Sequence, residues 1–474
     1  MIALTFAEVS ALIPVAGGTA QIPQLTHGTL TSFVLSWLAW LSALTMAPIE
    51  VQAVLQYAST YFPSLIHRVN DIPLLTRLGL AWAVLLMLLF CVINIGSFKG
   101  LVRFNFFIIF FKLFVIVLTI AVLIKTRFYP QNFNGLLLHT VSIPGWHGIL
   151  AAVATGGIAF AFTGFKHGVE LAGEAKQSAI AIPLAIVGSI VCCLIFYLGL
   201  QVAFIGALHP SLLAKGWGQL SFINDVGPFA GLAAGLGLIW LLKLLYMDAI
   251  VSPSGAGLIY MTSSARILYA MSQIGYVPRF LGYLNKNHFP LAAIFINFVI
   301  GIGLFLPLPG WQAMVSFLVS GMVISYAMGP IALLCLRLEF PEIKRPFRLP
   351  FANFLCLLAF YFCNLLSYWT GWQTFYKLFI AIVSGILFFL LAFKRKNRSL
   401  QPVGLKSLWW IVPYLVGLML ISYWGAFGGK NKIPFGWDFL VIALFSMIIL
   451  KLAVKNRLLR HENDTKLISS YFSN

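Results

Sequence analysis

Long apolar runs recur from one end of this chain to the other, and polar residues are confined to the short intervals between them. The hydrocarbon core of a bilayer is ~30 Å thick, so about 20 apolar residues span it as a helix. The runs are continuous rather than alternating, which favours helices over the strands of a barrel. Twelve runs of spanning length cover residues 30–58, 78–97, 104–124, 148–169, 182–207, 229–262, 290–308, 312–336, 351–369, 373–393, 408–427 and 434–454.

Composition agrees with this pattern. The 474 residues are 61% hydrophobic and only 9% charged, whereas about 25% of a soluble domain is charged. We therefore predict an all-α polytopic membrane protein, with a transmembrane domain over residues 1–454 and a cytoplasmic tail over residues 455–474. The lipid bilayer is its expected surrounding.

The basic residues predict the orientation of the spans. Cytoplasmic loops of membrane proteins are enriched in Lys and Arg. If the loop after residue 13 is cytoplasmic, most of the 31 Lys and Arg residues fall in cytoplasmic loops, and the C-terminus is cytoplasmic too. The net charge of +19 is explained in this way, so we expect no nucleic acid as a partner.

The first 13 residues are apolar but too short to span a membrane. As a helix they rise only about 20 Å. They have neither a basic n-region nor a small-residue cleavage site, which argues against a signal peptide. We interpret them as the second half of a helix whose first half is missing from the sequence.

The charged residues within the predicted spans include Glu50, Lys112 and Asp248. Charges at membrane depth are costly and are expected to face the interior of the helix bundle or water. Burial makes the proton of a lysine easier to lose, so Lys112 is a candidate for proton coupling; the alternative is a structural cation. Each of the two acids is an ion-pair partner, a proton site or a structural hydrogen-bonding group.

Glycines interrupt one span just before its charged end. Residues 156–175 read GGIAFAFTGFKHGVELAGEA. Glycines allow a membrane helix to unwind where its backbone lines a cavity. We expect the break at residues 161–164 (AFTG). The alternative is that the glycines serve close helix packing. The stretch SPSGAG at 252–257 is a second weak spot, in which Ser252 and Ser254 are either hydroxyl ligands or residues that bond to the backbone.

No enzyme motif is present. The chain has no P-loop, no HExxH and no GxSxG sequence. We therefore expect no catalytic residue, no metal and no cofactor.

Four segments together resemble the amino acid–polyamine–organocation (APC) superfamily of permeases, and the resemblance extends over essentially the whole chain. These segments are FAEVSALIPVAGGTAQIPQLTHG (6–28), TGGIAFAFTGFKHGVELAGEAKQSAIAIP (155–183), DAIVSPSGAGLIYMTSSARILYAMSQIGYVPRFLGYLNK (248–286) and RPFRLP (345–350). The KGWG sequence at 215–218 and two extra C-terminal spans resemble in particular its bacterial aspartate–proton symporters.

The resemblance implies a LeuT-type fold, in which two inverted five-helix repeats enclose a substrate site between broken helices 1 and 6. Helix 6 falls on residues 148–169, and the implied substrate-binding residues are Phe160, Ala161, Phe162, Thr163 and Gly164. The family's helix 1 and the first half of its helix 2 have no counterpart in this sequence.

The resemblance also implies a means of proton coupling. In proton-coupled relatives a lysine on helix 5 takes the place of a sodium ion, and Lys112 lies on that helix. From the residues themselves, we also predict that Ser252 and Asp248 take part in proton coupling. Thr163, Lys166 and His167 are candidates to bind the side-chain carboxylate of an acidic substrate.

The expected function is import of an amino acid, L-aspartate, in symport with protons across the inner membrane of a bacterial cell. One alternative is an amino acid exchanger or a permease of other specificity. Another is a non-transporting protein, either a truncated remnant or a substrate sensor.

Overall fold

The computed structural model describes residues 1–458 except 16, 70–71, 96–97, 134–142, 171, 176, 214–215, 218–219, 221, 223–226, 287–288 and 395–407. Of the predicted cytoplasmic tail, residues 459–474 lie outside the described residues.

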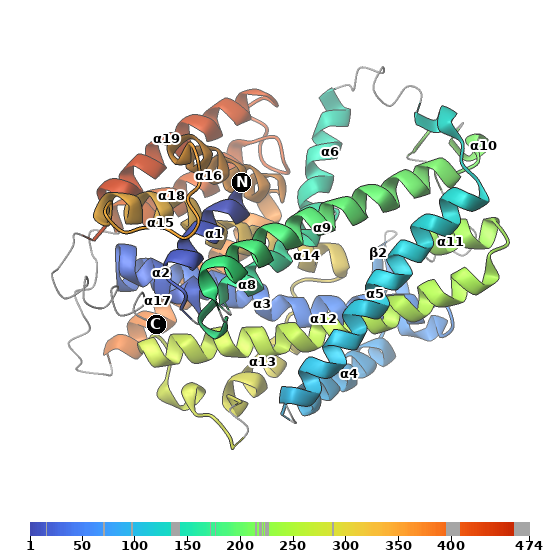
Figure 1. Cartoon of the computed structure of the whole chain (residues 1–474), viewed down its shortest axis with the longest axis horizontal. Helices are drawn as coiled ribbons and strands as arrows, with labels where there is room; N and C mark the ends of the chain where they lie inside the picture. Colours follow the sequence, from blue (N-terminus) through green and yellow to red (C-terminus); the bar gives the residue numbers. More distant parts are fainter. Residues whose placement is uncertain are drawn as a thin grey trace.

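The described chain is almost entirely helical (Figure 1). In chain order the elements are α1 (Ile2–Leu12), α2 (Gly18–His27), α3 (Thr29–Ala58), η1 (Pro63–Leu65), β1 (Ile66–Val69), β2 (Ile72–Leu75), α4 (Arg77–Ile95), α5 (Phe98–Thr126), η2 (Pro130–Phe133), α6 (Ile143–Thr155), α7 (Ile158–Ala161), η3 (Thr163–Phe165), α8 (Lys166–Glu170), η4 (Ala172–Glu174), α9 (Ser178–Ala207), α10 (Pro210–Leu213), α11 (Pro228–Gly235), α12 (Ile239–Ile274), η6 (Arg279–Gly282), α13 (Leu291–Gly303), α14 (Trp311–Tyr326), α15 (Met328–Glu339), α16 (Ala352–Trp369), α17 (Trp372–Lys394), α18 (Leu408–Trp424) and α19 (Trp437–Lys455).

The helices agree with a polytopic membrane protein. Within the described ranges, nine helices are long and apolar enough to cross a membrane, or ten if the bent pair Gly145–Ala161 and Thr163–Glu170 is one span. The predicted spans at 290–308 and 408–427 correspond to the shorter helices α13 and α18, of 13 and 17 residues. The strands β1 and β2, which the all-α prediction did not include, pair as one antiparallel hairpin.

The predicted span at 229–262 has different bounds in the structure. Helix α11 ends at Gly235, and α12 begins only at Ile239. Gly237 between them has φ +74, a backbone conformation that glycine adopts without steric cost. A turn therefore separates two helices that the apolar pattern had merged, and α12 continues well beyond the predicted end.

Burial distinguishes the central helices from the peripheral ones. Helix α3 is almost entirely buried and packs against α12 and α14 through the middle of the molecule (Figure 1). Helices α5 and α9, in contrast, have few buried residues in their most apolar windows, and many of their apolar side chains are exposed, as expected for surfaces that face lipid. The buried α3 is therefore the scaffold on which α12 and α14 are positioned.

A buried ion-pair network fixes α1 in place. Glu8 of α1 is only 1% exposed. Its carboxylate accepts hydrogen bonds from Arg337 Nε at 2.9 Å and Nη2 at 2.7 Å, and it lies 3.2 Å from Arg345 Nε. The backbone N–H of Leu349 donates to the same carboxylate at 2.6 Å. One acid thus joins α1, the end of α15 and the loop that contains RPFRLP.

Candidate functional site

The predicted break in the span at 148–169 is present. Helix α6 ends at Thr155, and Gly157, with φ +96, separates it from the short α7. A second interruption follows at Phe162, where the axis bends by 42° between Gly145–Ala161 and Thr163–Glu170. The bend lies within the residues 161–164 that the sequence indicated.

Tyrosines from two other helices bind carbonyl groups at the break. The hydroxyl of Tyr197 in α9 donates to the Ala161 carbonyl at 2.9 Å. The hydroxyl of Tyr326 in α14 donates to the Thr163 carbonyl, also at 2.9 Å. Non-helical backbone at membrane depth requires partners of this kind, because lipid offers none. The break is therefore stabilised by tertiary contacts as well as by glycine.

The five predicted substrate-binding residues differ in their surroundings. Phe160, Ala161 and Phe162 are half-buried, whereas Thr163 is only 5% exposed and donates its hydroxyl to the Phe160 carbonyl at 2.7 Å. Gly164 is exposed, and a Cβ placed on it would meet nothing within 4 Å. Gly164 therefore presents backbone to open space, where a ligand can approach closely.

Aromatic side chains surround the same segment. The ring of Phe160 lies edge-on to Trp311, with 6.1 Å between centroids, and Phe162 lies edge-on to Tyr197 at 5.1 Å. The side chain of Trp311 also approaches Gly157 so closely that an added Cβ would lie 3.0 Å from the ring. Helix α14 thus contacts the break at both of its interruptions.

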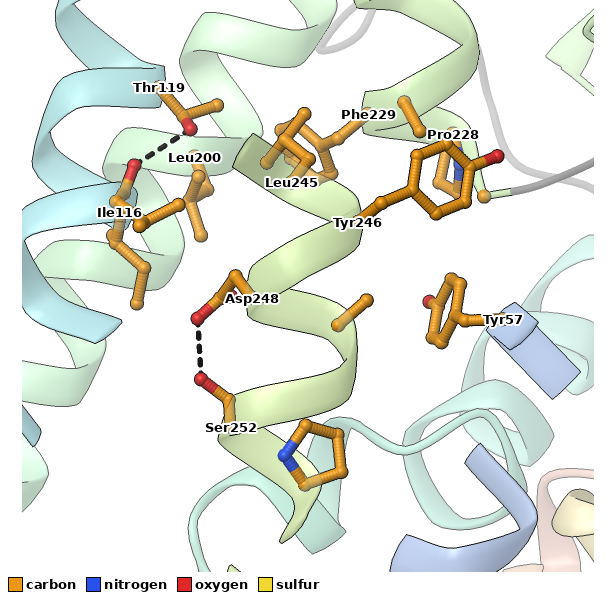
Figure 2. A pocket seen from close by; sticks show the side chains of 15 residues that line it. Tyr57, Ile116, Thr119, Leu200, Pro228, Phe229, Leu245, Tyr246, Asp248 and Ser252 are labelled. Atoms are coloured by element: carbon orange, nitrogen blue, oxygen red, sulfur yellow. Dashed lines mark hydrogen bonds between the residues drawn. The ribbon is translucent and has the colours of Figure 1, made fainter. Parts of the chain in front are cut away.

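The three residues predicted for proton coupling lie on two helices. Ser252 donates its hydroxyl to Asp248 Oδ1 at 2.5 Å within α12 (Figure 2). Lys112 on α5 is half-buried, and its charge acts on the carboxyl groups of both Asp248 and Glu50. Lys112 on α5 therefore interacts electrostatically with one acid on α3 and one on α12.

A cavity of about 300 Å³ adjoins this group. Figure 2 shows Asp248 and Ser252 on α12, with Tyr57 from α3 and Tyr246 on one side and Thr119 from α5 on the other. The remaining lining is largely apolar. The residues at 160–164 do not line this cavity, so the structure does not join the predicted binding and coupling groups in a single pocket.

A second, much smaller cavity of about 10 Å³ lies beside the break. A space of that size holds about one water. Its walls come from the broken helix, α3, α12 and α14, and comprise Ala39, Ala43, Thr163, Lys166, His167, Glu170, Tyr260, Ser263 and Met322. Two candidates for recognising a substrate carboxylate, Lys166 and His167, therefore share a cavity with Thr163.

Glu170 is a residue of this site to which the sequence gave no role. Its carboxylate accepts hydrogen bonds from Ser263 of α12 at 2.8 Å and from Thr19 of α2 at 3.5 Å. Its carbonyl accepts from the N–H of Gly17 at 2.9 Å. The only signal in the sequence is an acid four residues after Lys166 at the end of an apolar span. The partners are far away in the chain and appear only in the fold.

The predicted weak spot at 252–257 is not a break. Helix α12 runs through it without interruption, with Pro253 inside the helix. The hydroxyl of Ser254 donates to the Ile250 carbonyl at 2.7 Å. A Cβ on Gly255 would lie 3.0 Å from Ile108, and one on Gly257 would lie 2.5 Å from Phe90. These two glycines allow α5 and α4 to approach α12 closely, so the prediction of a break was wrong here.

Comparison with known proteins agrees with this architecture. The sequence profile of the amino acid permease family matches residues 1–391. The chain belongs to the amino acid permease family. This permease is a transporter of the APC superfamily, not an enzyme, and its substrate is an amino acid.

Two relatives from Bacillus subtilis align with almost the whole permease. It is 35% identical to the glutamate/serine transporter AimA, over 100% of this chain and 88% of that protein. It is 33% identical to an aspartate-proton symporter, over 95% of this chain and 86% of that protein. A branched-chain amino acid permease, BcaP, is 24% identical over 84% of both chains. The permease is therefore similar to an aspartate-proton symporter, as expected, and to a similar degree to a glutamate/serine transporter.

Proposed function

We propose that this permease imports an acidic amino acid, with L-aspartate as the substrate, in symport with protons. Its 33% identity to an aspartate-proton symporter supports both the substrate and the coupling. The observation that carries the coupling is that the charge of Lys112 acts on both Glu50 and Asp248 within the spans. Such charges are costly in a membrane, so their presence within spans supports a functional role.

The substrate backbone binds at residues 160–164. In support, the break leaves peptide groups of this segment outside a regular helix, where they act as ligands and half-helix ends act as dipoles. Gly164 presents backbone to open space, and Phe160 and Phe162 close over the bound substrate. In the proposed LeuT-type fold with inverted repeats, this segment lies near the bilayer midplane.

Lys112 carries the proton that drives uptake. While protonated, it attracts Asp248 and Glu50 and holds α5 against α12 and α3. Loss of that proton weakens the attraction and allows the helices to separate towards the inward-open state. Ser252 positions Asp248 for this role through their hydrogen bond.

The excess of Lys and Arg in alternate loops supports an orientation with a cytoplasmic C-terminus. We propose the inner membrane of a bacterial cell as the location. An inward proton gradient across that membrane is the energy source.

The coupling role is tested with Lys112→Ala in proteoliposomes that are loaded at neutral pH and diluted into acidic buffer. The wild type is expected to accumulate labelled L-aspartate and to lose this accumulation with a proton ionophore. Lys112→Ala is expected to lose accumulation but to keep exchange of internal for external aspartate. The matched control is Lys243→Ala, which alters an exposed lysine of α12. Accumulation by Lys112→Ala that still follows the proton gradient would contradict the role.

A second candidate function has its own support. The 35% identity to a glutamate/serine transporter favours a permease or exchanger with a different or broader specificity. Uptake that is insensitive to the ionophore and stimulated by a second amino acid inside the vesicles would favour this alternative. Binding of amino acids without flux would indicate a sensor.

A further inference from the structure

Lys166 is a buried cation within one helical turn of the break. It is 5% exposed, and its Nζ donates to the hydroxyl of Ser325 in α14 at 2.6 Å. The same Nζ lies 4.6 Å from the centre of the Tyr326 ring. Within the part of the chain that the structure describes, no carboxylate forms an ion pair with Lys166.

We propose that Lys166 binds the side-chain carboxylate of the substrate and thereby gives the permease its preference for acidic amino acids. This inference rests on the proposed function, since it names the group that recognises the substrate at the same break.

The argument begins with the unmet bonding capacity of Lys166. An ammonium group has three donors, and a buried charge requires a counter-charge and hydrogen bonds to offset its lost hydration. One hydroxyl and one aromatic ring meet only part of this need. A carboxylate brought by the substrate supplies both the opposite charge and the missing acceptors.

The neighbouring acid does not take this role. Glu170 lies four residues further along α8, and its charge acts on Lys166. Both of its carboxylate oxygens, however, accept hydrogen bonds from other elements, from Ser263 and from Thr19. Glu170 therefore holds α8 to α12 and α2.

Lys166 is well placed relative to the proposed backbone site. Thr163 and Lys166 are three residues apart, so they lie on neighbouring positions of one helix face, and both line the small cavity. Tyr326 links them, because its hydroxyl donates to the Thr163 carbonyl while its ring lies beneath the ammonium group. One helical turn rises about 5.4 Å, a length that an aspartate or glutamate side chain bridges.

The occupied state requires a local rearrangement. The cavity has about 10 Å³ of space, which is too small for a carboxylate. Binding therefore replaces the hydrogen bond between Lys166 and Ser325, and α8 and α14 separate slightly. A neutral side chain offers no charge in return for that lost bond, and this difference is the basis of the selectivity.

The test compares aspartate with asparagine, its neutral isostere. Binding of each to the purified full chain in detergent is measured from the ligand-induced rise in melting temperature. The wild type is expected to bind aspartate more tightly. Lys166→Gln is expected to weaken aspartate binding roughly 10- to 100-fold, the usual effect of losing a hydrogen bond to a charged group, and to change asparagine binding little. Lys166→Arg is expected to retain the preference, and Lys243→Gln is the matched control.

A second variant keeps the test decisive if Lys166→Gln does not fold. Ser325→Asp places a carboxylate at the present partner of Lys166 and satisfies the ammonium internally. We expect this variant to be at least as stable as the wild type and to lose its preference for aspartate over asparagine. A wild-type preference in either variant would overturn the inference.

The two proposals fail in different ways. A wild type that shows no preference for acidic amino acids overturns the proposed substrate. A wild type that prefers aspartate, together with a folded Lys166→Gln or Ser325→Asp that does so equally, overturns only the role of Lys166. Accumulation by Lys112→Ala that still follows the proton gradient bears on Lys112 alone and leaves the role of Lys166 unaffected.

Discussion

Two glycine-bearing stretches of this permease look alike in sequence and differ in structure. GGIAFAFTG in the span at 148–169 is interrupted twice, whereas SPSGAG in α12 is continuous helix. At the first stretch, Gly157 takes a positive φ and tyrosines bind the carbonyls of Ala161 and Thr163. At the second, the glycines pack against neighbouring helices and Ser254 bonds within its own helix.

The difference shows that glycine permits a break without requiring one. At membrane depth, carbonyl groups that leave a helix need new partners, because lipid provides none. Tyr197 and Tyr326 provide them at the broken helix. In α12 the glycines instead provide close contact with α4 and α5, which a longer side chain would prevent. Whether a glycine-rich stretch breaks the helix or serves close packing therefore depends on the groups that neighbouring helices present to it.

The largest effect in this comparison is expected from Gly157→Ala. Alanine at φ +96 is strained by about 1–2 kcal/mol, and its Cβ would lie 3.0 Å from the Trp311 ring. We expect a roughly tenfold loss of transport, measured as kcat/KM for aspartate in proteoliposomes. The control Gly188→Ala alters a helical glycine of α9 with open space around it and should leave transport unchanged. Equal transport by both variants would show that the break does not depend on Gly157.

An intermediate effect is expected from Tyr326→Phe. The variant keeps the ring beneath Lys166 but leaves the Thr163 carbonyl without its hydroxyl donor. The backbone N–H of Lys166 still donates to this carbonyl, so the loss is that of one hydrogen bond, about 0.5–1.5 kcal/mol, and the melting temperature should fall. Tyr361→Phe is the matched control, since its hydroxyl bond to the Phe439 carbonyl is longer, 3.3 Å, and lies elsewhere. A Tyr326→Phe variant as stable as the control would mean that tyrosine does not stabilise the break.

The smallest effect is expected from Gly255→Ala. This glycine lies in continuous helix, where alanine gains about 1 kcal/mol in helix propensity. The added Cβ would meet the methyl groups of Ile108 at 3.0 Å, and these can shift slightly. The gain in helix propensity and the cost of the close contact with Ile108 nearly cancel, so the melting temperature and the transport rate should both stay close to the wild type. A large loss of transport would indicate that α12 unwinds here during the cycle, contrary to the comparison.

The sequence predicted part of the candidate site well. The position of the break followed from glycines between an apolar run and a charged end, and it lies within the predicted residues 161–164. The membrane-depth charges Glu50, Lys112 and Asp248 were identified because such residues are rare in apolar spans. The charge of Lys112 acts on both acids in the fold, and the coupling role of the three residues stays a prediction.

Other features were not predictable from local pattern. The bounds of α12 were misplaced because a turn at Gly237 lies within an unbroken apolar run. The network around Glu8 joins residues more than 300 positions apart, and the partners of Glu170 come from α2 and α12. Pairs of this kind depend on how helices pack, and apolar periodicity carries no information about which polar residues then meet.

By itself, the sequence determined that this is a helical membrane protein, where most spans lie and where one of them is weakened. These properties follow from the cost of placing polar groups in hydrocarbon, which acts on each segment separately. Only the tertiary structure decided that one glycine-rich stretch breaks while another packs, and that Lys166 lies buried without a carboxylate partner among the described residues. Those outcomes depend on hydrogen-bond donors, acceptors and charges contributed by other helices, and they exist only once the helices are assembled.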